Sequence, residues 1–152
     1  MFPWRITAPK PRTLNYQQVL ALVEAFVVET GLRDFCSNTC HGKCCQGCYN
    51  SPNACHQNEG RRLPCSIYFC SRVSECIGKD NPAGGVWLSA WYDLRFKALQ
   101  QLDAMLRPAN PYFAVNKSKL VRKFRLPETL VLAATSDAGK QLVKERLPRL
   151  LV

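Results

Sequence analysis

The strongest constraint on how this chain can fold is the clustering of its cysteines. All nine lie between Cys36 and Cys76 in a chain of 152 residues. In a reducing compartment clustered thiols are more often metal ligands than disulfides, and an odd number cannot all pair within one chain. We therefore expect a metal-binding segment at residues 36–76. The candidate ligands are Cys36, Cys40, Cys44, Cys45, Cys48, Cys55, Cys65, Cys70 and Cys76.

The adjacent thiols of Cys44 and Cys45 suggest more than one metal centre. Neighbouring side chains leave the backbone in different directions, so these two thiols are poorly placed to bind one tetrahedral ion. If both are ligands, the simplest arrangement has two centres. One draws on Cys36, Cys40 and Cys44, and the other begins with Cys45 and Cys48, which are separated by two residues.

The spacing of the cysteines favours iron–sulfur over zinc. Irregular gaps suit ligands gathered around a larger cluster, whereas paired zinc knuckles repeat a two-residue gap that occurs here only between Cys45 and Cys48. We expect one or two 4Fe–4S clusters, with zinc as the alternative. His41 and His56 each follow a cysteine and could complete a zinc site, although nine thiols make a role beside the ligands the simpler expectation.

The rest of the chain predicts a mainly α fold. Its length favours a single domain, residues 1–152, with a core of modest size. Residues 1–12 contain three prolines and should form an extended arm. Residues 36–76 show no sustained apolar period, so we expect an irregular, cysteine-rich core whose backbone follows the metal.

Two stretches have apolar residues at helical spacing. The first begins after Thr13 or Asn15, either of which can cap a helix, and ends at Gly31. The second covers residues 86–106 and follows an expected turn at residues 81–85.

Three aromatic residues, Trp87, Trp91 and Tyr92, lie near the start of the second stretch. Core packing is the simpler explanation for them, and shielding a cluster from water is the alternative. Nothing in the sequence alone separates these two roles.

The C-terminal third is less clearly patterned. Residues 112–126 fit either a strand or a short helix, and residues 129–133 are apolar and β-prone, so a short strand pair can form near the C-terminus. Ser136 or Asp137 should cap a last short helix that ends before Pro148.

The net charge of +10 is concentrated toward the C-terminus. Residues 107–152 contain ten lysines or arginines against three acidic residues. Such a tail can bind nucleic acid by releasing counterions from phosphates, although a solvated basic face is the simpler explanation. Aromatic residues for base stacking are scarce nearby, so we expect only weak, sequence-indifferent binding. The cations that would contact phosphates are Lys117, Lys119, Arg122, Lys123 and Arg125.

The sequence predicts a cytoplasmic protein that does not enter a membrane. Its first residues lack the uninterrupted apolar run of a secretory signal, and no later stretch is long and apolar enough for a membrane span. A disulfide-stapled domain exported by an unrecognised signal is the alternative.

Two separate cysteine blocks resemble a known family. The first contains Cys36, Cys40 and the Cys44–Cys45 pair, and the second begins with Cys65-Ser66-Ile67-Tyr68 and continues through Arg72 to Cys76. Together they are similar to the CxxCxxCC-type zinc- or iron-chelating domain proteins, which include the cysteine region of flagellin lysine N-methylases. Here the first block is expanded, one extra residue separates Tyr68 from Arg72, and Val73 replaces a proline. The resemblance implies metal or cluster binding.

These features favour a small iron–sulfur protein that transfers electrons or supports redox-linked maturation of a partner protein. No cysteine stands out as a nucleophile and no histidine–carboxylate pair is apparent, so we expect no autonomous enzyme activity. The alternative function is a zinc-stabilised basic module that binds nucleic acid.

Overall fold

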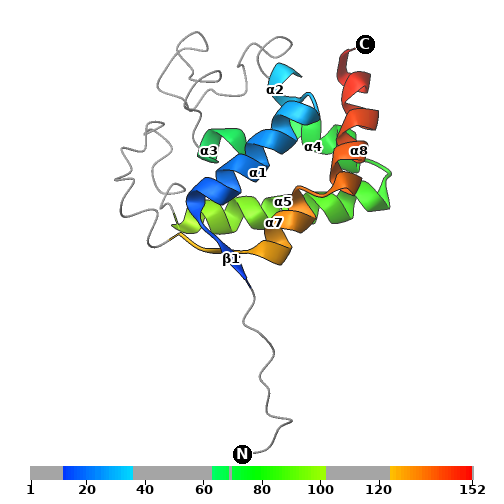
Figure 1. The fold of residues 1–152 in the computed structure, drawn as a ribbon. Helices are drawn as coiled ribbons and strands as arrows, with labels where there is room; N and C mark the ends of the chain where they lie inside the picture. The colour runs from blue at the N-terminus through cyan, green and yellow to red at the C-terminus, as the bar shows by residue number, and fades with distance from the viewer. Residues whose placement is uncertain (1–11, 36–62, 69, 102–123, 152) are drawn as a thin grey trace, which may run out of the picture.

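The computed structural model describes residues 12–35, 63–68, 70–101 and 124–151, and this part of the chain is mainly helical (Figure 1). The helices are α1 (Tyr16–Glu29), α2 (Leu32–Asp34), α3 (Leu63–Ser66), α4 (Ser71–Gly78), α5 (Pro82–Gln101), α7 (Glu128–Ala134), α8 (Asp137–Arg146) and the 3-10 helix η4 (Leu147–Leu151). Two short strands, β1 (Thr13–Leu14) and β2 (Leu126–Pro127), complete the described elements.

Helix α1 begins and ends where its sequence predicts. The side chain of Asn15 accepts a hydrogen bond from the Gln18 backbone N–H at 2.9 Å, and Gln18 Oε1 accepts one from the Asn15 N–H at 2.9 Å. This reciprocal pair is a capping box, which satisfies two donors at the start of the helix. After the C-cap residue Thr30, Gly31 adopts a φ of 85°, a left-handed conformation that favours glycine.

The centre of the core lies between α1 and α5, the long helix that runs below α1 in Figure 1. Phe26 of α1 packs against Trp87 and Trp91 of α5, with ring centroids 5.5 and 5.1 Å apart. Both indoles are buried, whereas Tyr92 is 40% exposed. The two tryptophans are therefore core residues.

Two predicted irregular stretches are helical. The turn predicted at residues 81–85 is wrong, because α5 already begins at Pro82, a residue well suited to the first position of a helix. The prediction that residues 36–76 are irregular is also wrong for the part that the structure describes, because Leu63–Ser66 form α3 and Ser71–Gly78 form α4. In α4 Val73 and Ile77 lie four residues apart on one buried face, a helical period too short to stand out in the sequence.

The predicted short strand pair is confirmed in part: the structure has a two-stranded sheet, but only one of its strands comes from the C-terminal third. Strand β2 pairs with β1 near the start of the chain, in antiparallel register with Thr13 opposite Pro127 and Leu14 opposite Leu126. The β-prone residues 129–133 lie in α7 instead. This helix packs on α5 and buries Val131, so tertiary packing overrides the local preference.

The last predicted helix is confirmed. Ser136 caps α8 by accepting a hydrogen bond from the Gly139 backbone N–H at 3.1 Å, and α8 ends at Arg146, before Pro148. In the described part of the chain no helix is long and apolar enough to cross a membrane. The predicted arm, apart from Arg12, and most of residues 112–126 lie outside the described residues.

A close approach between α8 and α5 gives a first prediction. A Cβ on Gly139 would lie 2.2 Å from the indole nitrogen of Trp87, which is held by a 2.8 Å hydrogen bond to the Ala134 carbonyl. We expect Gly139→Ala to lower the free energy of unfolding by about 1–3 kcal/mol in chemical denaturation. Gly85→Ala is the matched control, because nothing lies within 4 Å of its Cβ position. The control should raise stability by about 0.5–1 kcal/mol, and equal effects of the two substitutions would contradict the clash.

An ion pair joins the end of α1 to α8. Lys140 Nζ lies 2.9 Å from a carboxylate oxygen of Glu29, and Lys144 Nζ lies 3.6 Å from the other. The hydrogen bond and charge of Lys140 lower the pKa of Glu29, and the same hydrogen bond raises the pKa of Lys140. The carboxylate therefore adds stability that is lost as the pH falls through its lowered folded-state pKa. The lysine's contribution is lost only as the pH rises through its own raised pKa.

We expect Glu29→Gln to lower the melting temperature at neutral pH, because the variant cannot pair with either lysine. The difference from the wild type should begin to shrink as the pH falls below the usual carboxyl pKa of 4.5, where Glu29 of the unfolded chain takes up a proton, and should vanish once the pH is below the lowered pKa of the folded protein. Thermal melts of both proteins between about pH 7 and pH 3 measure this. A difference that stays constant over that range would show that the charge of Glu29 is not responsible.

Candidate functional site

The described chain is anchored to α1 on both sides of residues 36–62, which hold six of the nine cysteines. Phe35, the residue directly before Cys36, is buried just after α2, and Leu63 is buried at the start of α3. Both α2 and α3 pack against α1. The chain thus leaves α1 at one end of the segment and returns to it at the other.

One carboxylate of α1 binds both ends. Glu24 accepts a hydrogen bond from the guanidinium of Arg33, with which it also forms an ion pair, and another from the hydroxyl of Ser66. The side chain of Glu24 is 25% exposed and that of Arg33 is 20% exposed, so this contact lies largely out of solvent. Arg33 precedes Cys36 by three residues and Ser66 follows Cys65 directly, so the two ends are fixed relative to each other.

Further contacts hold α3 in place. The Leu63 backbone N–H donates to the hydroxyl of Tyr16 at 3.2 Å, and the indole N–H of Trp91 donates to the Ile67 carbonyl at 3.0 Å. The guanidinium of Arg95 lies 5.2 Å from the centre of the Tyr68 ring, within the range of a cation–π contact. The end of the segment therefore contacts both central helices, α1 and α5.

Three of the nine predicted ligands fall among the described residues. Cys65 lies in α3, Cys70 is buried at the N-cap of α4, and Cys76 lies on α4 itself. Among the side chains that the structure describes, which do not include that of Cys65, no group of three or more Cys, His, Asp or Glu residues could hold a metal ion. The other predicted ligands lie outside the described residues: Cys36, Cys40, Cys44, Cys45, Cys48 and Cys55.

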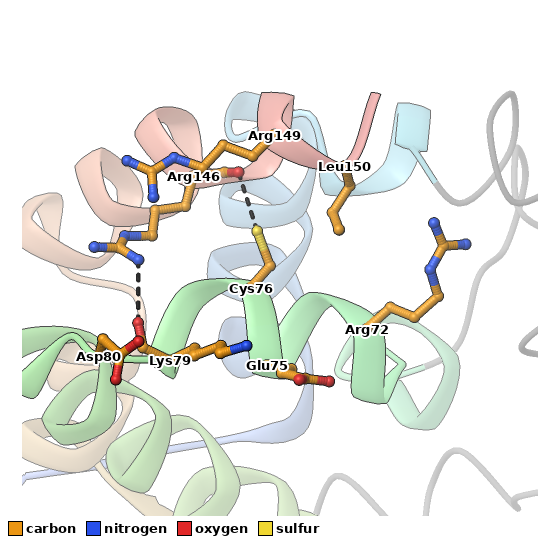
Figure 2. Close-up of a pocket in the computed structure, with 8 residues that line it drawn as sticks. All are labelled: Arg72, Glu75, Cys76, Lys79, Asp80, Arg146, Arg149 and Leu150. Carbon is orange, nitrogen blue, oxygen red and sulfur yellow. Dashed lines mark hydrogen bonds between the residues drawn. The ribbon is translucent and has the colours of Figure 1, made fainter. Parts of the chain in front are cut away.

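The thiol of Cys76 points toward the C-terminal helices. Its Sγ donates to the Arg146 carbonyl at 3.1 Å, across a groove between α4 and the end of α8 with η4 (Figure 2). The groove has a volume of about 490 Å³. Its charged lining residues are Arg72, Glu75, Lys79, Asp80, Arg146 and Arg149. Sequence analysis missed this groove, because its two sides come from segments far apart in the chain.

The basic stretch proposed to contact phosphates is represented in the described structure by Arg125. Its backbone N–H donates to Gln101 Oε1 at 2.8 Å, Gln101 Nε2 donates back to its carbonyl at 2.6 Å, and its guanidinium donates to the Phe124 carbonyl. These bonds join the start of β2 to the end of α5. Lys117, Lys119, Arg122 and Lys123 lie outside the described residues.

Comparisons with protein families, with curated proteins and with solved structures found no match to this chain. The resemblance of its two cysteine blocks to the CxxCxxCC-type chelating proteins therefore stays a prediction. Any function must be argued from the chain's own residues.

The contact at Glu24 gives the prediction for this site. We expect Glu24→Gln to lower the free energy of unfolding by about 1–3 kcal/mol, because the largely buried Arg33 loses its charged acceptor. Urea denaturation of the variant measures the change. Glu128→Gln is the matched control, since it removes an ion pair whose Arg12 side chain is 72% exposed, and it should cost about 0–1 kcal/mol. A cost at Glu24 no larger than at Glu128 would argue against this contact as an anchor.

Proposed function

We propose that this chain is a small iron–sulfur protein that transfers electrons or supports redox-linked maturation of a partner protein. The observation that carries the proposal is that Glu24 joins the two sides of residues 36–62, which hold six of the nine cysteines, through Arg33 before them and Ser66 after them. Gathering ligands from a long stretch of chain costs conformational entropy, and this cost is smaller when the residues on both sides of the stretch are already fixed. The helical body thus provides a frame for a segment rich in thiols.

The chemistry of the donor set supports a cluster. Thiolates are soft ligands that suit iron–sulfur clusters, and the gaps between the nine cysteines are irregular. Cys70 is buried beside Ser71, where α4 begins, so a thiolate there would lie at the positive end of a helix. When bound, a cluster would supply reversible one-electron transfer.

The charge of the chain fits a role in electron transfer. Clusters ligated by four thiolates are anionic, and a net charge of +10 on the chain would favour their retention. The same charge would speed encounter with an acidic partner protein, with a rate that falls as salt is added. The proposal needs no catalytic residue, since the cluster and a docking surface suffice.

The metal content of protein purified without oxygen tests the proposal. We expect a brown protein with about four or eight iron atoms and as many acid-labile sulfides per chain. Cys70→Ala should lower the iron content, whereas Ser71→Ala, an exposed neighbour at the same helix end, should leave it unchanged.

A colourless protein with stoichiometric zinc and no iron would contradict the iron–sulfur proposal. That result would favour the zinc-stabilised basic module, for which a salt titration of nucleic-acid binding is the next measurement.

A further inference from the structure

The groove between α4 and η4 has a lining with a net positive charge. Its cations exceed its acids by two. Lys79, Arg146 and Arg149 form no ion pair with any carboxylate in the described ranges, although Glu75 and Asp80 line the same groove. Like charges brought together in a concave surface raise the local concentration of anions.

One guanidinium is already fixed in position. Arg146 Nη1 donates to the Lys79 carbonyl at 3.3 Å, and the carbonyl of Arg146 accepts from the Cys76 thiol at 3.1 Å. The Nε of Arg146 is shielded from solvent and has no hydrogen-bond partner in the part of the chain that the structure describes. A preorganised guanidinium suits the planar oxygens of a carboxylate or the oxygens of a phosphate.

The cations lie at opposite ends of the groove. Figure 2 shows the guanidiniums of Arg146 and Arg149 on the same side of the groove, with that of Arg146 turned toward Lys79, whereas Arg72 lies at the other end and Cys76 between them. A ligand with one anionic group would satisfy one end only. A ligand with anionic groups at both ends would contact both.

We propose that this groove binds a small organic dianion whose carboxylate or phosphate groups lie at its two ends. A volume of about 490 Å³ falls within the range of small-ligand sites. Arg146 and Arg149 bind one anionic group, and Arg72 binds the other. Glu75 and Asp80 reject ligands with a further negative charge beside them. This inference does not require a cluster, because the groove is built entirely from described side chains, but it does require that the Cys76 thiol stay at the Arg146 carbonyl and not serve as a cluster ligand.

Isothermal titration calorimetry on the full chain as purified, at low ionic strength, tests the site. The probes are glutarate, adipate and 3-phosphoglycerate, called dianions here because each has two anionic groups, and acetate, which has one. The phosphate of 3-phosphoglycerate itself carries between one and two negative charges at neutral pH. We expect the dianions to bind with one-to-one stoichiometry and acetate to bind at least about tenfold more weakly. Preference for 3-phosphoglycerate would identify the ligand as a phosphate compound, and preference for glutarate or adipate would identify it as a dicarboxylate.

Variants localise the binding. Arg146→Gln and Arg149→Gln should each weaken dianion binding by about tenfold or more, because each loses a charged hydrogen-bond donor. Lys97→Gln is the matched control, since it removes the same charge from α5, outside the groove, and should bind as the wild type does. Circular dichroism checks that each variant is folded. If Arg146→Gln does not fold, Arg149→Gln provides the test. The Arg149 side chain is exposed and forms no hydrogen bond or ion pair with the described residues.

The proposal is wrong if the wild type binds none of the three dianions, or if acetate binds as tightly as they do. It is also wrong if the folded groove variants bind dianions as tightly as Lys97→Gln, which would mean that overall charge, and not the groove, attracts them. Metal content has no part in these outcomes, so a colourless or zinc-bound protein would leave them unchanged.

Discussion

The packing of Phe26 against Trp87 and Trp91 is the contact on which the rest of the described structure depends. These rings join the two central helices, and each indole N–H extends the contact to another element. Trp87 donates to the Ala134 carbonyl at the end of α7, and Trp91 donates to the Ile67 carbonyl just after α3. Large apolar rings thus supply burial while their single polar atoms fix the neighbouring backbone. These contacts hold together the helices next to the cysteine segment.

The parts of the fold that the sequence predicts are those with a local physical signal. The capping box at Asn15, the glycine after α1 and the cap at Ser136 all act within one turn of a helix, so they can be recognised without knowing what lies nearby. The incorrect predictions concern segments whose state is decided by packing. The β-prone start of α7 becomes helical against α5, and β2 finds its partner at the beginning of the chain.

The candidate sites also differ in how far the sequence predicts them, according to whether the signal is local. Clustered cysteines indicate metal chemistry from the sequence alone, because the residue type itself restricts the chemistry. The role of Glu24 has no such signal, since Ser66 lies 42 residues away from it. The groove also depends on distant residues, with Cys76 and Arg146 separated by 70 positions. A charge count places Arg146 in a basic tail but does not show that it faces α4.

The pairing of β1 with β2 has a consequence for the order in which the chain can be built. Thr13 is made early, whereas its partner Pro127 is made only after every cysteine from Cys36 to Cys76 has been added. During synthesis β1 therefore lacks its partner β2 at a stage when all nine thiols are already present. Contacts between such distant residues also form slowly in folding, because the long intervening loop must close first. All nine cysteines are thus present in the cell before β1 and β2 pair.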